Sequence, residues 1–280
     1  MSNSFNPTDN QAPASNLAGI TVLANPPSRP GQFFDPSKFS RLFELESRSF
    51  WFRGRSDLIG WALRQYFPDA KSFMEIGCGT GYVLGRLHRE FPDVAFSGSE
   101  LFAEGLQYAR QRLPDSVRLY QLDATDMPFR ESFDAMGAFD VVEHISDDRR
   151  VLENIFRALK PGGGLLLTVP QHAWLWSQTD VAACHVRRYQ RHALLALLRE
   201  TGFVVERASS FVSLLLPAML LARMRKQSGG DEIESELNLP SLLNEFGYFS
   251  LRVETALIRA GITLPLGGSL LAVARKPDRA

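Results

Sequence analysis

A glycine-rich turn constrains the fold of this chain more than any other feature. The heptapeptide Glu75-Ile76-Gly77-Cys78-Gly79-Thr80-Gly81 follows a short apolar run and precedes an amphipathic, helix-like segment. A strand that leads through spaced glycines into a helix is typical of an open α/β sheet that binds a nucleotide-like ligand. Glycine permits positive φ angles and a close approach of the backbone to a ligand. We therefore expect a ligand to lie against this turn.

Strand-like and helix-like segments alternate through most of the chain. We predict strands over residues 72–76, 94–97, 117–122, 133–139, 165–169, 203–207 and 269–275. The main predicted helices cover residues 80–91, 102–113, 147–159 and 191–201. Strands separated by helices of about ten residues indicate parallel βαβ units. The sequence thus predicts an α/β fold with helices on both faces of a mostly parallel, Rossmann-like sheet.

Composition narrows the class of protein. The chain has 280 residues with 31 basic and 31 acidic side chains, so it lacks the basic excess of nucleic-acid-binding proteins. Neither Cys78 nor Cys184 lies in a CxxC pair, and we expect no metal site and no disulfide framework. No apolar run reaches the roughly 18 residues of a transmembrane helix, and the N-terminus carries no secretion signal. We expect a cytoplasmic protein.

The chain divides into a tail and one domain. Residues 1–32 are rich in Ser, Asn, Pro and Ala, and we expect a flexible tail there. A single domain would occupy residues 33–280. It would include a helical N-terminal cap over 36–67, in two pieces separated by Phe50-Trp51-Phe52-Arg53, and a helical insertion over about 211–261.

Spacing and charge favour one ligand for the glycine turn. Dinucleotide sites use GxGxxG, whereas this turn reads GxGxG and begins with the acid Glu75. A carboxylate there disfavours a pyrophosphate and suits S-adenosylmethionine (SAM), which carries an amino group and a sulfonium. Glu100 and Asp123 follow the next two strands, where ribose hydroxyls and an adenine amine would find acceptors. Glu100 fits NAD equally well, so a nicotinamide-dependent oxidoreductase remains the alternative.

These residues resemble the class I SAM-dependent methyltransferases over most of residues 40–276. The resemblance implies that the donor is bound by the residues of four motifs: Glu75, Gly77, Cys78, Gly79 and Gly81 in the first, Glu100 and Leu101 in the second, Asp123 and Ala124 in the third, and Phe139 at the start of Phe139-Asp140-Val141-Val142-Glu143-His144. It also implies a seven-stranded sheet whose last strand, residues 269–275, runs antiparallel beside 203–207.

Two further segments resemble a narrower bacterial subgroup of small-molecule methyltransferases. They are Phe50-Trp51-Phe52-Arg53-Gly54-Arg55 and the stretch that runs from Trp174 to Tyr189. The fourth-strand motif is similar to that of the ubiquinone-biosynthesis methyltransferases. The resemblance implies a small-molecule methyl acceptor, and we consider lipid-like molecules and natural-product precursors. A SAM-binding module without catalysis is a third reading.

Candidate catalytic and acceptor residues lie in and near these segments. His144 and His185 are candidates for a general base, because an imidazole titrates near neutral pH. Structural hydrogen bonding is the alternative for both residues. Contact with the acceptor is predicted for Trp51, Arg53, Trp176, Arg187, Arg188 and Tyr189. The alternative is that the arginines fix their loop to the core and the aromatics pack a helix. Residues 211–226 are apolar with a basic end and suit either a covering helix or peripheral membrane contact.

Overall fold

The fold was analysed on a computed structural model, which describes residues 15–17, 19–24, 35–225 and 238–278. Its strands are β1 (Ser15–Leu17), β2 (Ile20–Val22), β3 (Ser72–Ile76), β4 (Ala95–Glu100), β5 (Arg118–Gln121), β6 (Phe133–Phe139), β7 (Leu159–Pro170), β8 (Val204–Phe211) and β9 (Ser269–Arg275). Its α-helices are α1 (Phe39–Leu45), α2 (Phe50–Tyr66), α3 (Tyr82–Glu90), α4 (Ala103–Arg112), α5 (Asp148–Ala158), α6 (Gln178–Ala182), α7 (Arg191–Glu200), α8 (Leu216–Arg225) and α10 (Ser241–Arg259). Short 3-10 helices are η1 (Pro36–Lys38), η2 (Val142–His144) and η3 (Ala173–Leu175).

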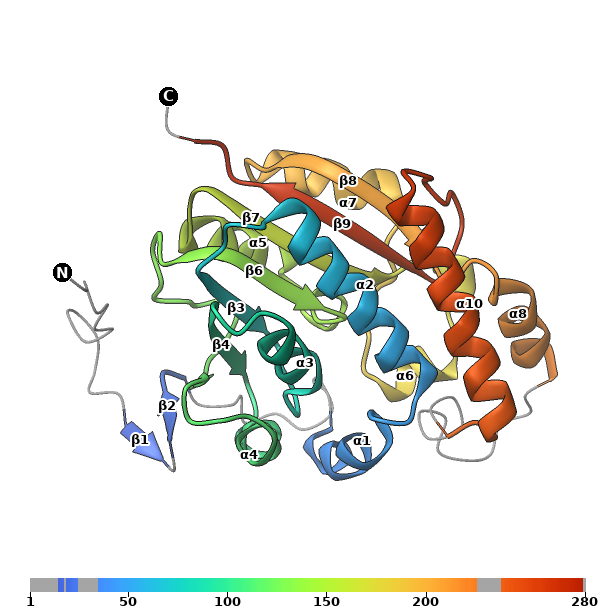
Figure 1. Cartoon of the computed structure of the whole chain (residues 1–280), viewed down its shortest axis with the longest axis horizontal. Helices are drawn as coiled ribbons and strands as arrows, with labels where there is room; N and C mark the ends of the chain where they lie inside the picture. Colours follow the sequence, from blue (N-terminus) through green and yellow to red (C-terminus); the bar gives the residue numbers. More distant parts are fainter. Residues whose placement is uncertain (1–14, 18, 25–34, 226–237, 279–280) are drawn as a thin grey trace.

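The described strands form one sheet in the order β1-β2-β5-β4-β3-β6-β7-β9-β8 (Figure 1). Strands β2 to β7 pair in parallel, and β9 runs antiparallel between β7 and β8. The predicted seven-stranded sheet with an antiparallel last strand is therefore present as β3 to β9. Because parallel strands share a direction, the ends of β3, β4, β5 and β6 meet at one edge, which we call the carboxyl edge.

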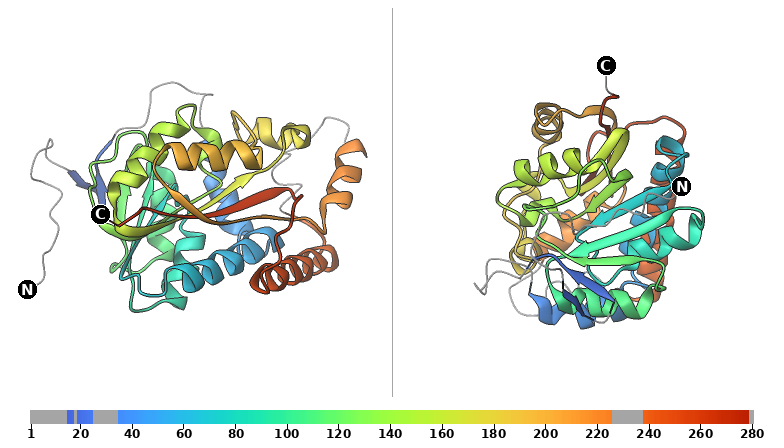
Figure 2. Two further views of the ribbon diagram at one scale, coloured as in Figure 1. Left: turned by 90° about the horizontal axis from the view of Figure 1, so that it is seen from above. Right: turned by 90° about the vertical axis from the view of Figure 1, so that its left-hand side faces the viewer.

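Two apolar cores lie on opposite faces of the sheet. Helices α2, α3, α4 and α10 cover one face and α5 and α7 cover the other, as the views in Figure 2 show. Alternation along the strands assigns the side chains: Phe73 packs with the first group and Met74 with the second, while Leu166 and Leu167 are divided in the same way. A sheet buried on both faces explains why its strands read as continuous apolar runs.

The sequence-based helix boundaries need correction before the first sheet strand. The aromatic segment Phe50–Arg53 was expected to separate two helices, but it forms the first turn of α2. Its aromatic rings are partly buried against the core, so tertiary packing overrides their modest helix propensity. Residues 171–189, where we predicted no helix or strand, contain two short helices, η3 and α6.

Part of the expected flexible tail belongs to the sheet. Strand β2 pairs in parallel with β5, and β1 pairs with β2, so the expectation is wrong for residues 15–17 and 20–22. Ile20 supplies a physical reason, because its side chain is buried in the core. The rest of residues 1–32 falls largely outside the described residues, as does 226–237 in the expected helical insertion, which otherwise contains the end of β8 together with α8 and α10.

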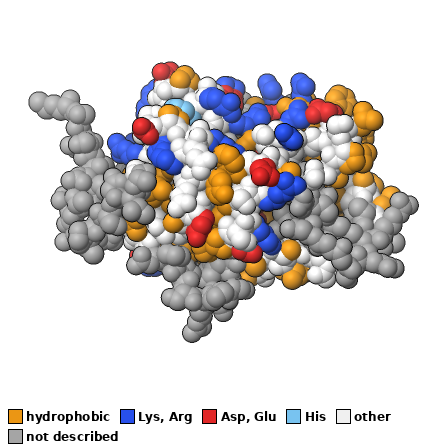
Figure 3. All heavy atoms as spheres, turned by 90° about the horizontal axis from the view of Figure 1, so that it is seen from below, with side chains coloured by type: hydrophobic (Ala, Val, Ile, Leu, Met, Phe, Trp, Pro, Cys, Tyr) orange, Lys and Arg blue, Asp and Glu red, His pale blue; other side chains and the backbone are white. Residues whose placement is uncertain are grey.

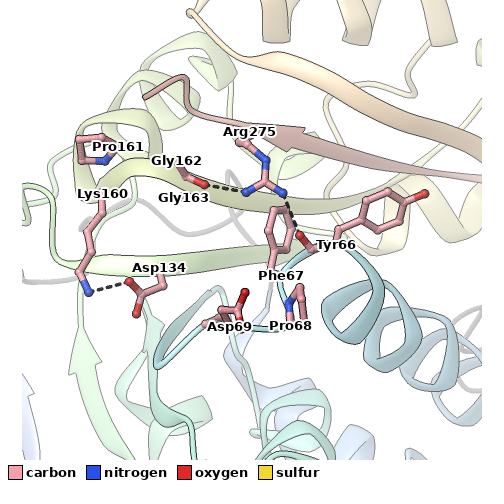
Figure 4. Close-up of a pocket in the computed structure, with 11 residues that line it drawn as sticks. Tyr66, Phe67, Pro68, Asp69, Asp134, Lys160, Pro161, Gly162, Gly163 and Arg275 are labelled. Carbon is pink, nitrogen blue, oxygen red and sulfur yellow. Dashed lines mark hydrogen bonds and ion pairs between the residues drawn. The ribbon is translucent and has the colours of Figure 1, made fainter. Parts of the chain in front are cut away.

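A cavity of about 330 Å³ opens at the opposite, amino edge of the sheet (Figure 4). It lies between the end of α2 and the starts of β6 and β7. Lys160 pairs with Asp134 across one side, and Arg275 donates hydrogen bonds to the carbonyls of Gly162 and Tyr66 on the other. These groups satisfy one another and are remote from the glycine turn, so the cavity is not part of the candidate site.

Close packing between α2 and β7 generates a first prediction. A Cβ atom added at Gly164 would overlap the ring of Phe67. We expect Gly164→Ala to lower the free energy of unfolding by about 1–3 kcal/mol, the usual cost of overpacking. Denaturant unfolding measures the loss. The double variant Gly164→Ala/Phe67→Leu should recover part of it, and additive losses would contradict the overlap.

Candidate active site at the carboxyl edge

The glycine turn has the backbone that its sequence predicts. Gly77, Gly79 and Gly81 have φ angles of 64°, 52° and 74°, and Gly81 is the N-cap of α3. A side chain at Gly77 would also collide with Val141, whose Cγ2 lies 2.5 Å from the ideal Cβ position. The turn therefore needs glycine for its backbone conformation and, at Gly77, for space.

A buried polar cluster fixes this turn from outside. Thr80 donates to Glu46, and the Arg112 guanidinium donates to Glu46 Oε2 at 2.8 Å and to Thr80 Oγ1 at 2.9 Å. Thr80 therefore ties the turn to α1 and α4 and does not cap α3. The sequence analysis did not identify Glu46 or Arg112, because their contacts join segments that are far apart in the chain.

Glu75 is the second-last residue of β3, directly before the turn. Its side chain is buried, and its Oε2 has no hydrogen-bond partner within the described part of the chain. Burial raises the pKa of Glu75 to about 8, although Arg55 acts in the opposite direction. A buried carboxyl oxygen without a partner requires a donor, so this atom is a candidate contact for a ligand's ammonium or hydroxyl group.

Glu100, at the end of β4, connects the turn to the next helix. Its Oε2 accepts a hydrogen bond from the Gly79 N–H at 3.2 Å, and its Oε1 accepts from Leu101 at 2.7 Å and Phe102 at 3.2 Å. Burial raises the pKa of Glu100, and these N–H groups offset part of that rise. The carboxylate is thereby held in one orientation at the position predicted for ribose recognition.

The third predicted acid follows β5. Asp123 Oδ1 accepts from the backbone N–H of Thr125 at 2.8 Å and from its hydroxyl at 2.7 Å. The Ala124 carbonyl accepts from the Asn154 side chain at 3.0 Å. These bonds anchor the loop after β5 to α5, beside the ends of β3 and β4.

Cys78 has a packing role within the turn. A Cβ atom at Gly98 would lie 2.9 Å from the Cys78 sulfur, so this small side chain packs directly over the neighbouring strand. Burial raises the pKa of the Cys78 thiol well above its usual value. A protonated, buried thiol is a poor nucleophile. The small size of the Cys78 side chain, and not its reactivity, therefore accounts for its place in the turn.

A buried ion pair closes the site from the side of α2. Arg55 pairs with Asp140, which directly follows β6, and the guanidinium also lies over the rings of Trp51 and Phe52 at 5.5 Å and 5.2 Å. Asp140 has a positive φ of 57°, unusual for a residue with a side chain. Both residues lie in motifs of the sequence, but no contact between them was predicted, because they are far apart in the chain and meet only in the fold.

Four ionisable side chains gather after β6 and in the segment that folds over it. Glu143 and His144 come from η2, and Asp180 and His185 come from α6 and the loop behind it. The His144 and His185 rings pack edge to face with centroids 4.6 Å apart. Asp180 Oδ1 accepts from His185 Nδ1 at 2.8 Å, while His185 Nε2 lies 4.0 Å from Glu143 Oε1.

The surroundings of His144 and His185 distinguish these two candidates for a general base. Burial lowers the pKa of His144 to about 3, aided by His185. Such an imidazole is neutral but is a weak base at neutral pH, which argues against His144 as the general base. Burial alone would raise the pKa of Asp180, but the hydrogen bonds from His185 and Arg188 lower it to about 2. Ionised Asp180 thus favours the His185 tautomer with its proton on Nδ1.

The predicted acceptor residues make extensive internal contacts. Arg187 pairs with Asp148 at 2.6 Å, Arg188 pairs with Asp180 at 2.7 Å, and the Tyr189 hydroxyl donates to Asp148. These bonds fix the segment over the carboxyl edge, as the alternative reading expected.

The predicted aromatic contacts differ in exposure. Trp51 stacks on Phe211, with ring centroids 5.6 Å apart. Arg53 reaches away to Glu245 and Tyr248 on α10. Trp176 is 43 % exposed. Of the predicted acceptor residues, Trp176 is the one with most surface available to a ligand.

Comparisons with known proteins agree with this geometry. The family model "Methyltransferase domain" matches residues 74–167, which run from the glycine turn to β7. The O-methyltransferase cnsE of Penicillium expansum is 27 % identical over 66 % of this chain and 72 % of its own length. The 27-O-demethylrifamycin SV methyltransferase of Amycolatopsis mediterranei is 27 % identical over 73 % of this chain and 77 % of its own. The chain therefore carries a methyltransferase domain and is a SAM-dependent methyltransferase.

A solved structure supports the fold of this methyltransferase. Phosphoethanolamine N-methyltransferase 2 of Haemonchus contortus, in complex with SAM, superposes with a TM-score of 0.53 at 22 % identity, covering 79 % of this chain and 52 % of that one. The enzyme class and the cofactor SAM, both inferred from the glycine turn and its neighbouring acids, are confirmed by the family model and the sequence relatives.

The residues at the carboxyl edge fit SAM. The unpartnered Oε2 of Glu75 suits the ligand's ammonium, the oriented carboxylate of Glu100 suits its ribose, and the glycine backbone permits close approach. When bound, SAM supplies an electrophilic methyl group on a sulfonium. The protein's task is to hold donor and acceptor in line and exclude water.

We predict that Glu100→Ala weakens SAM binding by about 1–3 kcal/mol, because charge-assisted ribose bonds are lost. Titration calorimetry measures this change. Exposed Glu104, four residues away on α4, gives the matched control Glu104→Ala, which should bind normally. If both variants bind SAM with equal affinity, a residue other than Glu100 must bind the ribose.

The buried Glu75 gives a pH prediction for the ligand-free methyltransferase. Its folded pKa, about 8, lies above the ordinary value of 4.5, so its contribution to stability is fully present below pH 4.5 and is lost as the pH rises towards 8. Glu75→Gln should flatten this loss by roughly 1–3 kcal/mol between pH 5 and pH 8. Denaturant unfolding at both pH values measures it. An unchanged pH slope would show that Glu75 is not the group responsible.

Proposed function

We propose that this methyltransferase transfers the methyl group of SAM to a hydroxyl oxygen of a small, largely apolar molecule, either lipid-like or a precursor of a natural product. The enclosure of the site carries the proposal. The segment from Gln171 to Tyr189 folds over the carboxyl edge, where the side chains of Glu143 and His185 are only 0 % and 14 % exposed. An enclosed site suits a small acceptor better than a macromolecular one.

Two further observations support this choice of acceptor. Two of the relatives, cnsE and the rifamycin enzyme, are named for O-methylation or for an O-demethylated substrate. Aromatic side chains, among them Trp51 stacked on Phe211 and the exposed Trp174 and Trp176, lie on segments that flank the ends of β6, β7 and β8. Apolar rings there suit a carbon-rich acceptor.

Helix α10 supports a lipid-like acceptor. Its buried face is mixed: Leu251 and Ile258 join the core, and the other buried residues are Asn244, Gly247, Ser250, Glu254 and Thr255. Four apolar side chains on its outer surface are more than half exposed: Leu242, Leu243, Phe246 and Phe249. Hydrophobic side chains also gather towards the end of the molecule that carries α8 and α10 (Figure 3). Within the described residues, no helix is long and apolar enough to cross a bilayer.

We assign the donor to Glu75, Gly77, Cys78, Gly79, Gly81, Glu100, Leu101, Asp123, Ala124 and Phe139. We assign activation of the acceptor to His185. His144 is not the candidate base, because its lowered pKa of about 3 makes it a weak base. Asp180 holds the His185 ring in position. Peripheral membrane contact, the cytoplasmic location and acceptor contacts by Trp51, Arg53, Trp176, Arg187, Arg188 and Tyr189 stay predictions.

A methyl-transfer assay tests the proposal. The full chain is incubated with methyl-labelled SAM and a panel of apolar alcohols and phenols, with matched amines and with protein and RNA as macromolecular acceptors. We expect label in an O-methylated small molecule and at least tenfold less transfer with His185→Gln. Label in amines only, or in protein or RNA, would contradict the proposed acceptor. SAM binding without any transfer would favour the non-catalytic alternative.

A further inference from the structure

The carboxyl edge holds three metal-binding donors that methyl transfer by itself does not require. Glu143, His144 and His185 each present one ligand atom, and these atoms lie within 4.8 Å of one another. No metal site was expected from the sequence, because neither cysteine lies in a CxxC pair. This grouping joins a histidine–glutamate pair in η2 to a histidine on the overlying segment.

Glu143 is the first observation that points to a ligand. Its side chain is completely buried, yet neither carboxyl oxygen has a hydrogen-bond partner among residues 35–225 and the other described segments. Buried polar groups in proteins are normally satisfied by a partner, a water or an ion. The His185 Nε2 is 4.0 Å from Oε1, beyond hydrogen-bond distance.

The orientation of His185 is the second, independent observation. Its Nδ1 donates to Asp180, whose Oδ1 also accepts from Arg188 at 2.7 Å and whose Oδ2 accepts from the Ser177 N–H at 2.8 Å. Asp180 is therefore fixed by three neighbours. The lone pair of His185 Nε2 then points toward Glu143. A carboxylate behind a histidine in this way is the usual outer-shell arrangement of metal-binding imidazoles.

Donor type and spacing select the metal. Two imidazoles and one carboxylate form a set that binds Zn²⁺ and related transition metals, whereas Mg²⁺ and Ca²⁺ prefer oxygen ligands. Bonds of about 2.1 Å place donor atoms of one tetrahedral ion about 3.4 Å apart. Because the three atoms lie within 4.8 Å, each would need to move by less than about 1 Å.

We propose that Glu143, His144 and His185 form a binding site for one divalent transition-metal ion, with Asp180 as the positioning residue for His185. Three protein ligands leave at least one coordination position open, as in catalytic zinc sites. An acceptor oxygen would occupy that position, and the ion would then activate it in place of the free His185 Nε2; this last step rests on the proposed function. Metal binding itself rests only on the geometry of the three side chains.

Metal titration of the untagged, chelator-treated full chain tests the proposal. Co²⁺ is the spectroscopic probe and Zn²⁺ the calorimetric one. We expect one ion per chain, visible Co²⁺ absorption bands of a site with nitrogen ligands, and a Kd of micromolar or lower. His185→Gln and Glu143→Gln should each weaken binding at least 100-fold. Asp180→Asn should weaken it about 10- to 100-fold, the usual cost of losing an outer-shell partner.

His192, exposed on α7, gives the matched control, because His192→Gln removes a histidine without touching the site. Equal losses in this control, or full binding by the His185 variant, would overturn the proposal, as would an absence of Co²⁺ bands in the wild-type chain. Circular dichroism checks the folding of each variant. If the buried Glu143→Gln variant does not fold, the metal affinity of the His185→Gln variant, whose site residue is partly exposed, decides the test. The methyl-transfer assay on the same samples keeps failure of the metal site distinct from failure of the proposed function.

Discussion

The structure depends on how Glu100 joins three segments at the carboxyl edge. One carboxylate, at the end of β4, accepts from the N–H of Gly79 in the glycine turn and from the N–H groups of Leu101 and Phe102 before α4. These bonds hold the turn in the left-handed conformation that only glycine adopts readily. Thr80 and Glu46 fix it from the other side. The donor site is thus built largely from backbone, which a ligand can approach closely.

Buried carboxyl groups at this edge differ between the donor side and the acceptor side of the site. On the donor side, Glu75 and Glu100 have raised pKa values because burial disfavours their ionised forms. On the acceptor side, Asp140 is paired with Arg55 and Asp180 with Arg188, so both carboxylates are compensated within the fold. Glu143 is the exception, because it is buried and neither of its carboxyl oxygens has a hydrogen-bond partner in the described residues. Uncompensated carboxyl groups mark where ligands are expected, and here they lie on both sides of the point where donor and acceptor would meet.

Much of the fold was predictable because its signals are local. Strands β6 and β9 begin and end where they were predicted from the sequence. The spaced glycines of the turn from Glu75 to Gly81 indicate its positive φ angles. The family resemblance supplied the antiparallel position of β9. Other features depend on contacts between distant segments. Phe50 begins α2 because Asn244 of α10 accepts from its N–H, and the Arg55–Asp140 pair and the approach of His185 to Glu143 arise only when the sheet assembles. Strand β2 is only three residues long, too short for a clear periodic pattern, and is specified by its pairing with β5.

The central claim is that the carboxyl edge of this sheet is a SAM site. Calorimetric titration of the purified full chain with SAM, its demethylated product and NAD tests it most directly. The account predicts binding of SAM and the product at one site per chain, with micromolar affinity, and no heat of binding with NAD. Binding of NAD alone, or of none of the three, would contradict the account and leave only the α/β fold established.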